Sequence, residues 1–464
     1  MTVFLRTHCA SSTARKWAGI TILTLLFYTL TSTLSLSKFS FKYPSSRPPR
    51  PRPPLGGTCS PKEYANGSWS YHPRTNASVM THPRESLAFS GFENCASSRE
   101  YFWHLGADDE TQYDRFPGAQ SWEWIPGGGC EGMRALSKES LVRNLVENGG
   151  WYLVGDSVTE NHFFSLSCVL YPHVIATPDY TENANFDRGW AQHLYLSPSS
   201  PLRGTLALPK GFNISFTPLV TFRRVDLLFS KDELVDIHKA IQPANNLKAP
   251  KDQTLFSEEP VWTLPVSQYL SEFLAPLPMD NYATMVVSTG GHWTTTLFSG
   301  VSPEGIKGVL SLFEHAMQRW AERVQEELTS QQRTKFGGTT ATTTTTTSST
   351  DRGRPRRRVL VRAYLPGHES CHGFRKPWKE VQPFVWNWFN WGDIWAFNAV
   401  FEKLLSTRRF PDIHYLGIDR PARLRPDAHT TGDCLHIMAG AGVLEGWTHY
   451  IWHFVTQYAD VNGY

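Results

Sequence analysis

The sequence lacks three features that would each point to a particular class of protein. It has no internal repeat of the solenoid kind, and no group of cysteines and histidines has the spacing of a zinc site, because Cys371-His372 stands alone. Net charge is also scarce, since 45 basic and 42 acidic residues leave a formal charge of only +3. We therefore expect neither a repeat scaffold nor a zinc module, and no bound metal.

Even this small positive charge is concentrated in two segments that are not expected to fold. Residues 1–58 hold eight basic and no acidic residues, and residues 337–358 hold five arginines and Asp351. The remaining 32 basic and 41 acidic residues give the rest of the chain a net charge near −9. Because binding to nucleic acid requires a basic surface on the folded domain, nucleic acid is not an expected partner. The Arg352–Arg358 run is interpreted as a solvated linker.

One hydrophobic run has the length of a membrane span. Residues 17–36 are mostly apolar, follow Arg15 and Lys16, and lack a clear small-residue cleavage site. We predict a type II signal anchor with a cytoplasmic tail at 1–16 and a Pro/Arg-rich stem at 37–58; a cleaved signal peptide is the alternative. Basic residues flank both sides of the run, so charge alone does not give its orientation.

Cysteines and glycosylation sequons indicate where the rest of the chain resides. Six cysteines follow the run, an even number that suits three disulfides. Three Asn-x-Ser sequons begin at Asn66, Asn76 and Asn213. Together with the predicted anchor, they place the folded part in the lumen of the secretory pathway.

The folded part is expected to have two regions. Residues 59–145 are rich in Gly, Cys and aromatics without long periodic segments, which indicates an irregular, disulfide-held subdomain. Residues 146–464 alternate apolar runs with helical patterns, which predicts an α/β domain with a mostly parallel sheet and helices on both faces. The expected strands are 151–155, 217–229, 283–288, 358–364 and 412–418, and the expected helices are 157–170, 303–327, 391–406 and 445–458. The Thr-rich segment 337–358 is predicted to be a disordered insertion.

A candidate nucleophile stands at the first of these strand-to-helix turns. Gly155-Asp156-Ser157 directly follows the apolar run Trp151–Val154 and precedes a helical pattern. A serine at such a turn has an exposed hydroxyl beside a helix N-terminus, where negative charge is favoured. The alternative interpretation is that Ser157 only caps the helix.

A candidate base and its orienting acid lie near the end of the chain, in Asp433-Cys434-Leu435-His436. A carboxylate three residues before a histidine can accept from one ring nitrogen while the other nitrogen faces a nucleophile. Ser157, Asp433 and His436 would then form a catalytic triad. Other histidines compete for the role of base: His162, His292, His368, His372, His429 and His449.

Several blocks of the sequence resemble the plant trichome-birefringence-like proteins, with a form closer to their fungal relatives. Gly155–His162, with Cys168 eleven residues after the serine, is similar to the first block of that family, and Asp412–Arg420 with Asp433–His436 is similar to its closing block. Thr289–Trp293 and Arg362–Glu369 resemble the two blocks between them. The segments Cys59–Trp69 and Trp122–Cys130 are similar to parts of the cysteine-rich N-terminal domain of that family. The likeness covers residues 59–464 apart from the Thr-rich insertion.

This resemblance implies an SGNH-hydrolase-like three-layer α/β sandwich and polysaccharide O-acetyltransferase activity in the Golgi. It implies that Ser157 accepts the acetyl group, that His436 is the base and that Asp433 orients it. It also implies the disulfides Cys59–Cys130, Cys95–Cys168 and Cys371–Cys434. The chain departs from the plant pattern at Ser288, where the family has Asn, and by one inserted residue at Gly290-Gly291.

The residues that hold the oxyanion and substrate are less evident. We assign the oxyanion hole to the backbone N–H of Ser157 and the side chain of Asn161, with Gly291 or His292 as alternatives. Arg362 either binds an anion or substrate or pairs with a carboxylate. Trp293 is the preferred sugar-stacking candidate, whereas helical spacing favours core packing for Trp386, Trp388, Trp391 and Trp395.

These observations predict a single-pass Golgi membrane enzyme that moves an acyl group, acetyl being expected, onto hydroxyls of a polysaccharide or glycan. It would use an acetyl donor such as acetyl-CoA as cosubstrate, directly or through a membrane partner, and no permanently bound cofactor. An esterase of the same fold and a non-catalytic glycan-binding protein of cell-wall assembly remain as alternatives.

Overall fold

The computed structural model describes residues 59–76, 79–130, 132–182, 187–241, 254–336 and 357–462. The predicted tail, anchor and stem, and all but the last two residues of the predicted insertion, lie outside these ranges. Within them, no helix combines the length and the apolar character needed to cross a membrane. The described residues all belong to one compact unit, Arg50–Tyr464.

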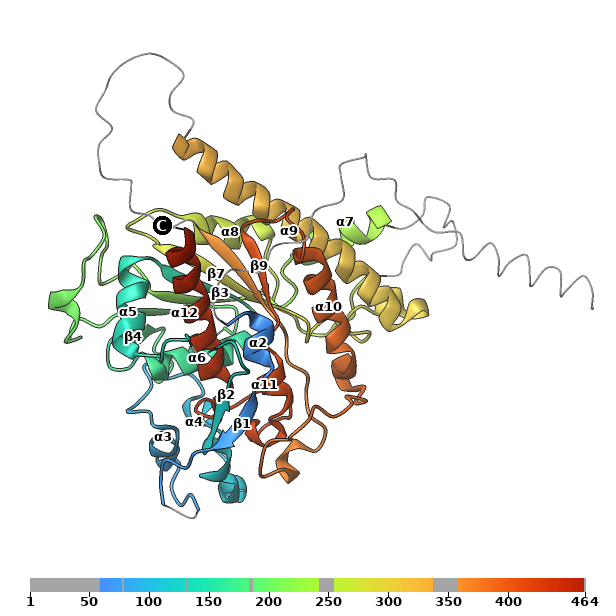
Figure 1. Ribbon diagram of the computed structural model, residues 1–464. Coiled ribbons are helices and arrows are strands. Elements are labelled where there is room, and N and C mark those ends of the chain that lie inside the picture. The colour runs from blue at the N-terminus through green and yellow to red at the C-terminus, as the bar shows by residue number, and fades with distance from the viewer. Residues whose placement is uncertain are drawn as a thin grey trace, which may run out of the picture. The chain divides into compact units, whose positions relative to one another are not determined.

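A seven-stranded sheet forms the centre of this unit (Figure 1). Its order is β4 (Val174–Thr177), β5 (Gln192–Leu196), β6 (Val220–Arg224), β3 (Gly150–Gly155), β7 (Tyr282–Ser288), β8 (Arg358–Arg362) and β9 (Ile413–Leu416). The strands from β6 to β9 run parallel, and β4 and β5 are antiparallel additions at one edge. The central strands are buried on both faces, which explains their continuous apolar runs. The predicted α/β class with a mostly parallel sheet is therefore confirmed.

Helices cover the two faces of the sheet (Figure 1). On one face α6 (Ser157–Val169) packs against α12 (Val443–Asn462), and on the other the long α9 (Ile306–Phe336) contacts both α7 (Lys231–Ile241) and α10 (Ile394–Leu405). Two more helices, α5 (Lys138–Glu147) and α8 (Val266–Leu274), contact β3 and β7. This arrangement places the carboxyl ends of the parallel strands at one edge of the sheet, where ligands bind in such folds.

The N-terminal segment is mostly irregular. It holds α2 (Pro61–Ala65), α3 (Glu85–Ser90), α4 (Tyr101–His104) and an antiparallel pair of short strands, β1 (Ser68–Tyr71) and β2 (Trp122–Ile125). The indole of Trp69 donates to the Pro421 carbonyl in α11 (Arg420–Arg423), at 3.0 Å, which ties the segment to the C-terminal part of the chain. The disulfides Cys59–Cys130, Cys95–Cys168 and Cys371–Cys434 are all present, as predicted.

The structure corrects three sequence interpretations. Arg358 opens β8 and is buried, and Arg357 donates to the carbonyls of Leu274, Ala275 and Tyr282, so these two arginines are not part of a solvated linker. Trp293 is fully buried and stacks on Phe298, so it cannot be a sugar platform. Conversely, Trp388 and Trp395 are 57% and 66% exposed, whereas helical spacing favoured the core for both.

Candidate active site

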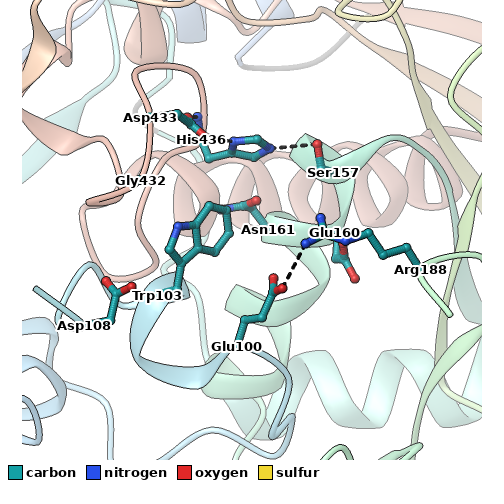
Figure 2. Close-up of a pocket in the computed structure, with 10 residues that line it drawn as sticks. All are labelled: Glu100, Trp103, Asp108, Ser157, Glu160, Asn161, Arg188, Gly432, Asp433 and His436. Atoms are coloured by element: carbon teal, nitrogen blue, oxygen red, sulfur yellow. Dashed lines mark hydrogen bonds and ion pairs between the residues drawn. The ribbon is translucent and has the colours of Figure 1, made fainter. Parts of the chain in front are cut away.

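Ser157, His436 and Asp433 lie together at the carboxyl end of β3 (Figure 2). The Ser157 Oγ atom is 2.7 Å from Nε2 of His436, and Nδ1 of His436 is 2.6 Å from Oδ2 of Asp433. The other carboxylate oxygen of Asp433 accepts from the backbone N–H groups of Leu435 and His436, at 2.8 and 2.9 Å. The carboxylate therefore fixes both the ring and the main chain that carries it, and it selects the tautomer with hydrogen on Nδ1.

Ser157 is placed by regular secondary structure. A Cβ at Gly155 would come within 2.5 Å of the Ser288 carbonyl oxygen, so only glycine fits at this end of β3. Asp156, not Ser157, caps α6: its Oδ1 accepts from the Val158 N–H at 3.1 Å. The interpretation of Ser157 as a helix cap is therefore wrong, and its hydroxyl is left to interact with His436. As the first residue of the helix, Ser157 contributes an N–H to the turn that lacks intrahelical acceptors.

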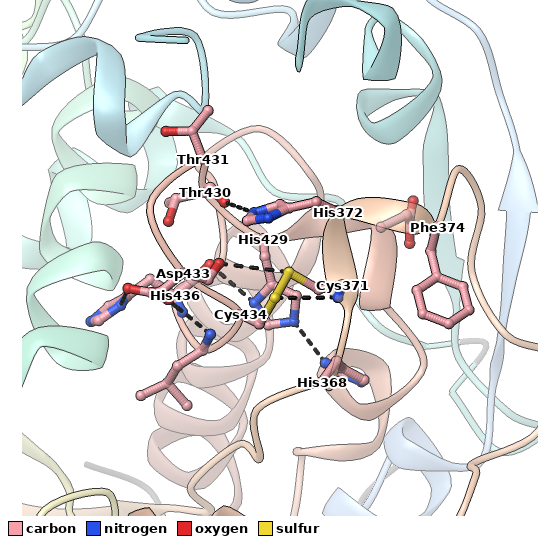
Figure 3. Close-up of a disulfide and its surroundings, with 12 residues drawn as sticks. His368, Cys371, His372, Phe374, His429, Thr430, Thr431, Asp433, Cys434 and His436 are labelled. Carbon is pink, nitrogen blue, oxygen red and sulfur yellow. Dashed lines mark hydrogen bonds and ion pairs between the residues drawn. A yellow bond between two sulfur atoms is a disulfide. The ribbon is translucent and has the colours of Figure 1, made fainter. Parts of the chain in front are cut away.

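His436 stands on a loop that several cross-links hold (Figure 3). The Cys371–Cys434 disulfide fixes the loop two residues before the histidine. The carbonyl of His436 accepts from the Thr430 N–H at 2.9 Å and faces Nδ1 of His429 at 3.2 Å. Nδ2 of Asn161, on α6, donates to the Ile437 carbonyl at 2.9 Å. This last bond connects the helix of Ser157 directly to the loop of His436.

Two of the competing histidines form a buried pair behind this loop. Nδ1 of His368 is 2.7 Å from Nε2 of His429, and Nε2 of His368 faces the Arg423 carbonyl at 3.0 Å. Burial lowers the pKa of His368 to about 4 and the pKa of His429 well below its ordinary value. Both imidazoles are therefore neutral at neutral pH and support the main chain rather than contact Ser157.

The charges of the triad fit its geometry. Burial raises the pKa of the Asp433 carboxyl, but the His436 imidazole and two backbone N–H groups outweigh burial and hold this pKa well below its ordinary value. Asp433 is therefore ionised across the physiological range, as an orienting acid must be.

An open pocket of about 460 Å³ surrounds the triad (Figure 2). It is lined by Glu100, Trp103, Asp108, Ser157, Glu160, Asn161, Arg188, Gly432, Asp433 and His436. The Trp103 ring meets the His436 ring edge to face at 5.2 Å. A Cβ at Gly432 would lie 2.8 Å from Nε1 of Trp103, so glycine permits this close approach. Trp103, Glu100 and Asp108 come from the irregular N-terminal segment, which offered no periodic signal by which the sequence could identify them.

Carboxylates dominate the walls of the pocket. Glu160 is buried and pairs with Nε of the buried Arg99 at 2.7 Å, and burial raises the pKa of Glu160. Arg188 pairs with Glu100 at 3.1 Å. With Glu160 paired to Arg99 and Glu100 paired to Arg188, the lining also holds the carboxylates of Asp108 and Asp433, which makes the pocket more suitable for neutral groups than for anionic ones.

The structure brings only some of the predicted oxyanion and substrate residues to this pocket. Asn161 lines it. Gly291 lies against the Tyr364 side chain, and Nε2 of His292 lies 3.9 Å from Asp226; neither belongs to the pocket lining. Arg362 is 1% exposed, its guanidinium lies 3.7 Å above the Trp447 ring, and burial lowers its pKa to about 10. Arg362 is therefore a core residue that does not contact Ser157.

Among the described residues, the Cys371, His372 and Cys434 side chains come close enough to suggest a metal site. Both sulfur atoms belong to the disulfide, however, and provide no thiolate for a metal.

Comparison with protein-family models gives no match, and a search of curated proteins finds no relative above the level of chance. The resemblance to the trichome-birefringence-like proteins therefore rests on the sequence blocks quoted above.

Proposed function

We propose that this protein is a serine acyltransferase that moves an acyl group, with acetyl as the first candidate, onto hydroxyls of a polysaccharide or glycan. The observation that carries the proposal is the continuous chain from Ser157 Oγ through His436 to Asp433, at 2.7 and 2.6 Å. Such a chain activates a serine for covalent catalysis. The polysaccharide as acceptor and the SGNH-type fold are proposed on the resemblance of the sequence blocks.

In the first half-reaction, the Ser157 oxygen attacks the acyl carbonyl carbon of the donor while Nε2 of His436 takes the hydroxyl proton. The tetrahedral intermediate then collapses, the bond to the donor's leaving group breaks, and His436 returns the proton to that group. Asp433 stabilises the imidazolium that forms in between. The product is an acyl-serine.

In the second half-reaction, an acceptor hydroxyl takes the position of the leaving group. His436 removes its proton, the acceptor oxygen attacks the acyl-serine, and collapse of the second intermediate returns the proton to Ser157. The Trp103 face and the carboxylates that line the pocket suit a sugar, whose ring stacks on aromatics and whose hydroxyls donate to carboxylates.

For the oxyanion we propose the backbone N–H of Ser157 and the second N–H of Asn161. The Asn161 amide uses one N–H for the Ile437 carbonyl, which leaves the other for an oxygen in the pocket.

Esterase activity is the second candidate, and the openness of the pocket favours it. Ser157 is only half-buried, so water can reach an acyl-serine when no acceptor occupies the pocket. A transferase would need the bound acceptor itself to exclude water.

We further propose that the protein acts in the Golgi lumen, anchored by residues 17–36, and that acetyl-CoA or an equivalent donor is a cosubstrate that does not stay bound. The three disulfides and the sequons support an oxidising lumenal compartment.

The proposal is tested by incubating purified full-length protein with a labelled acetyl donor and a neutral polysaccharide. Transfer predicts label in the polysaccharide, lost in Ser157→Ala. Release of free acetate alone would identify an esterase. If neither product forms and Ser157→Ala still performs the protein's role in cells, the protein is a non-catalytic glycan binder.

A further inference from the structure

A second pocket, of about 310 Å³, lies away from Ser157 and shares no lining residue with the first. It is lined by Pro366, Gln382, Pro383, Phe384, Trp391, Gly392, Ile394, Trp395, Asn398, Asp419 and Arg423. These residues come from the segment between β8 and α10, which includes the 3-10 helix Trp388–Asp393, from the first turns of α10, and from the two ends of α11. The reaction proposed above uses none of them.

Three aromatic side chains, Phe384, Trp391 and Trp395, contribute to the lining of this pocket. Trp391 is 8% exposed and forms part of the wall, whereas Trp395 is 66% exposed at the rim. Trp388, in the adjacent 3-10 helix Trp388–Asp393, is 57% exposed, and Val385 is 74% exposed. Exposed indoles in the segment that lines a pocket are the kind of surface feature that marks an interaction site.

The lining also includes polar side chains. The Asp419 carboxylate lies 3.6 Å from the Arg423 guanidinium, and both side chains are half-buried. Asn398 also lines the pocket, but its amide is engaged with the backbone N–H and carbonyl of Tyr364. Asp419, Arg423 and the exposed Gln382 therefore remain as groups that accept from and donate to a ligand, and the charges of Asp419 and Arg423 cancel.

We propose that this second pocket binds neutral sugar units of a polysaccharide chain. The polarised C–H groups on one face of a pyranose ring match the negative face of an indole, and ring hydroxyls match an adjacent carboxylate and guanidinium. A membrane or an apolar protein surface would cover the tryptophans but would offer no hydrogen-bond partner to the donors and acceptors that the Asp419–Arg423 pair still has free of each other. The charge balance of the pocket favours a neutral sugar over an acidic one.

The second pocket also adjoins the loop of His436. A Cβ at Gly367 would lie 2.3 Å from the Trp391 ring and 3.0 Å from the Cys434 carbonyl, so one residue separates the pocket wall from the catalytic loop. His368 and His429 lie between the Arg423 carbonyl, 3.0 Å from Nε2 of His368, and the His436 carbonyl, which faces Nδ1 of His429 at 3.2 Å. A polysaccharide held here would therefore lie against the wall that supports the His436 loop, and its binding would not require Ser157.

Affinity electrophoresis tests this proposal with full-length protein in native gels that contain mannan, xylan, β-1,3-glucan or acidic polygalacturonate. We expect at least one neutral polysaccharide to retard the protein more than polygalacturonate does. Trp395→Ala should weaken the apparent affinity by about three- to tenfold, the effect of losing one aromatic contact. Asp419→Asn should weaken it while every tryptophan remains.

Two controls make the result specific. Phe216→Ala removes another exposed aromatic residue, 44% exposed and outside this pocket, and should be retarded like the wild type. Ser157→Ala should also be retarded like the wild type, so that loss of catalysis and loss of this binding are distinguishable.

The proposal is overturned if no neutral polysaccharide retards the protein, or if Trp395→Ala is retarded as strongly as the wild type. It is also overturned if Trp395→Ala abolishes only self-association or flotation with phosphatidylcholine vesicles.

Discussion

Ser157 and His436 meet at 2.7 Å, but the protein holds them by different means. Ser157 stands where a buried strand turns into a helix, and neighbours in the chain, Gly155 and Asp156, determine its position. His436 stands on an irregular loop whose supports come from distant parts of the chain. The disulfide partner of that loop is 63 residues away, and Asn161 is 276 residues from Ile437.

Because of this difference, the positions of Ser157 and His436 should respond differently to substitutions. The position of Ser157 depends on local geometry that persists while the sheet is folded. The position of His436 depends on a few cross-links, so their removal should reduce catalysis while the fold remains. Substitutions that address each side in turn can therefore test the comparison.

The largest effect is expected from the nucleophile itself. Ser157→Ala removes the atom that forms the acyl bond and should reduce the turnover of an acetyl ester by about 10⁴- to 10⁶-fold. Ser271→Ala, an exposed serine on α8, is the matched control and should keep wild-type turnover. Substantial turnover by Ser157→Ala would mean that another group performs the reaction.

Asp433→Asn should follow, with a loss of about 10⁴-fold in kcat. An amide carries no charge to stabilise the imidazolium of His436. Its NH2 group can also donate to Nδ1, which favours the tautomer with hydrogen on Nε2, and Nε2 can then no longer take the proton of Ser157. Asp114→Asn, which breaks a surface pair with Arg375, serves as the control. Equal kcat values for the two variants would remove Asp433 from the site.

Asn161→Ala examines the residue that connects the two sides. If its free N–H stabilises the oxyanion, kcat should fall by about 10²-fold or more with little change in KM. If Asn161 only braces the Ile437 carbonyl, the loss should be about three- to tenfold, as for one neutral hydrogen bond. Steady-state kinetics at saturating ester distinguishes these outcomes, and the smaller loss would contradict our oxyanion assignment.

Two disulfides of similar loop length provide a matched pair for the comparison. Removing Cys371–Cys434 or Cys59–Cys130, with sequence separations of 63 and 71, should lower the unfolding free energy by similar amounts of about 2–4 kcal/mol. Only the first holds the His436 loop, so only Cys371→Ser/Cys434→Ser should also lose about tenfold in kcat below its melting temperature. An equal loss of activity in both double variants would show that the loop does not depend on its disulfide.

Lowering the pH should reduce the stability of the fold around both Ser157 and His436, because buried histidines lie near each of them. His104 and His162 lie against or within the helix of Ser157, and His368 and His429 lie behind the His436 loop; burial lowers the pKa of all four. Because the unfolded chain binds protons near pH 6.5 and the folded chain does not, stability falls as pH decreases from about 6.5 toward 4, the folded pKa of His368. Urea unfolding at several pH values measures this slope, which should be smaller in His368→Gln. A slope of zero would contradict the neutral histidines.

The sequence predicted the regular part of the molecule better than the irregular part. Continuous apolar runs identified β3, β7 and β8, and the turn at Gly155 indicated Ser157, because both signals are local. Trp103, Glu100 and Arg188 were missed, since they reach the pocket through long-range contacts that leave no periodic pattern. The exposed Trp395 was misjudged for a related reason: helical spacing records a stripe of residues but not whether a neighbouring element covers it. Arg362 was misjudged in the opposite direction: it was a candidate for binding substrate, but its side chain is buried over Trp447. That burial depends on the packing of α12, which the sequence around Arg362 does not record.

The most direct test of the central claim is mass spectrometry of the full-length protein after brief exposure to an acetyl donor without acceptor. The account predicts a peptide containing Ser157 that is heavier by one acetyl group, more abundant at rapid quench and removed when a polysaccharide acceptor is added. Ser157→Ala should show no such adduct. An acetyl group found reproducibly on another residue, or catalytic turnover with no adduct at Ser157 at any quench time, would contradict it.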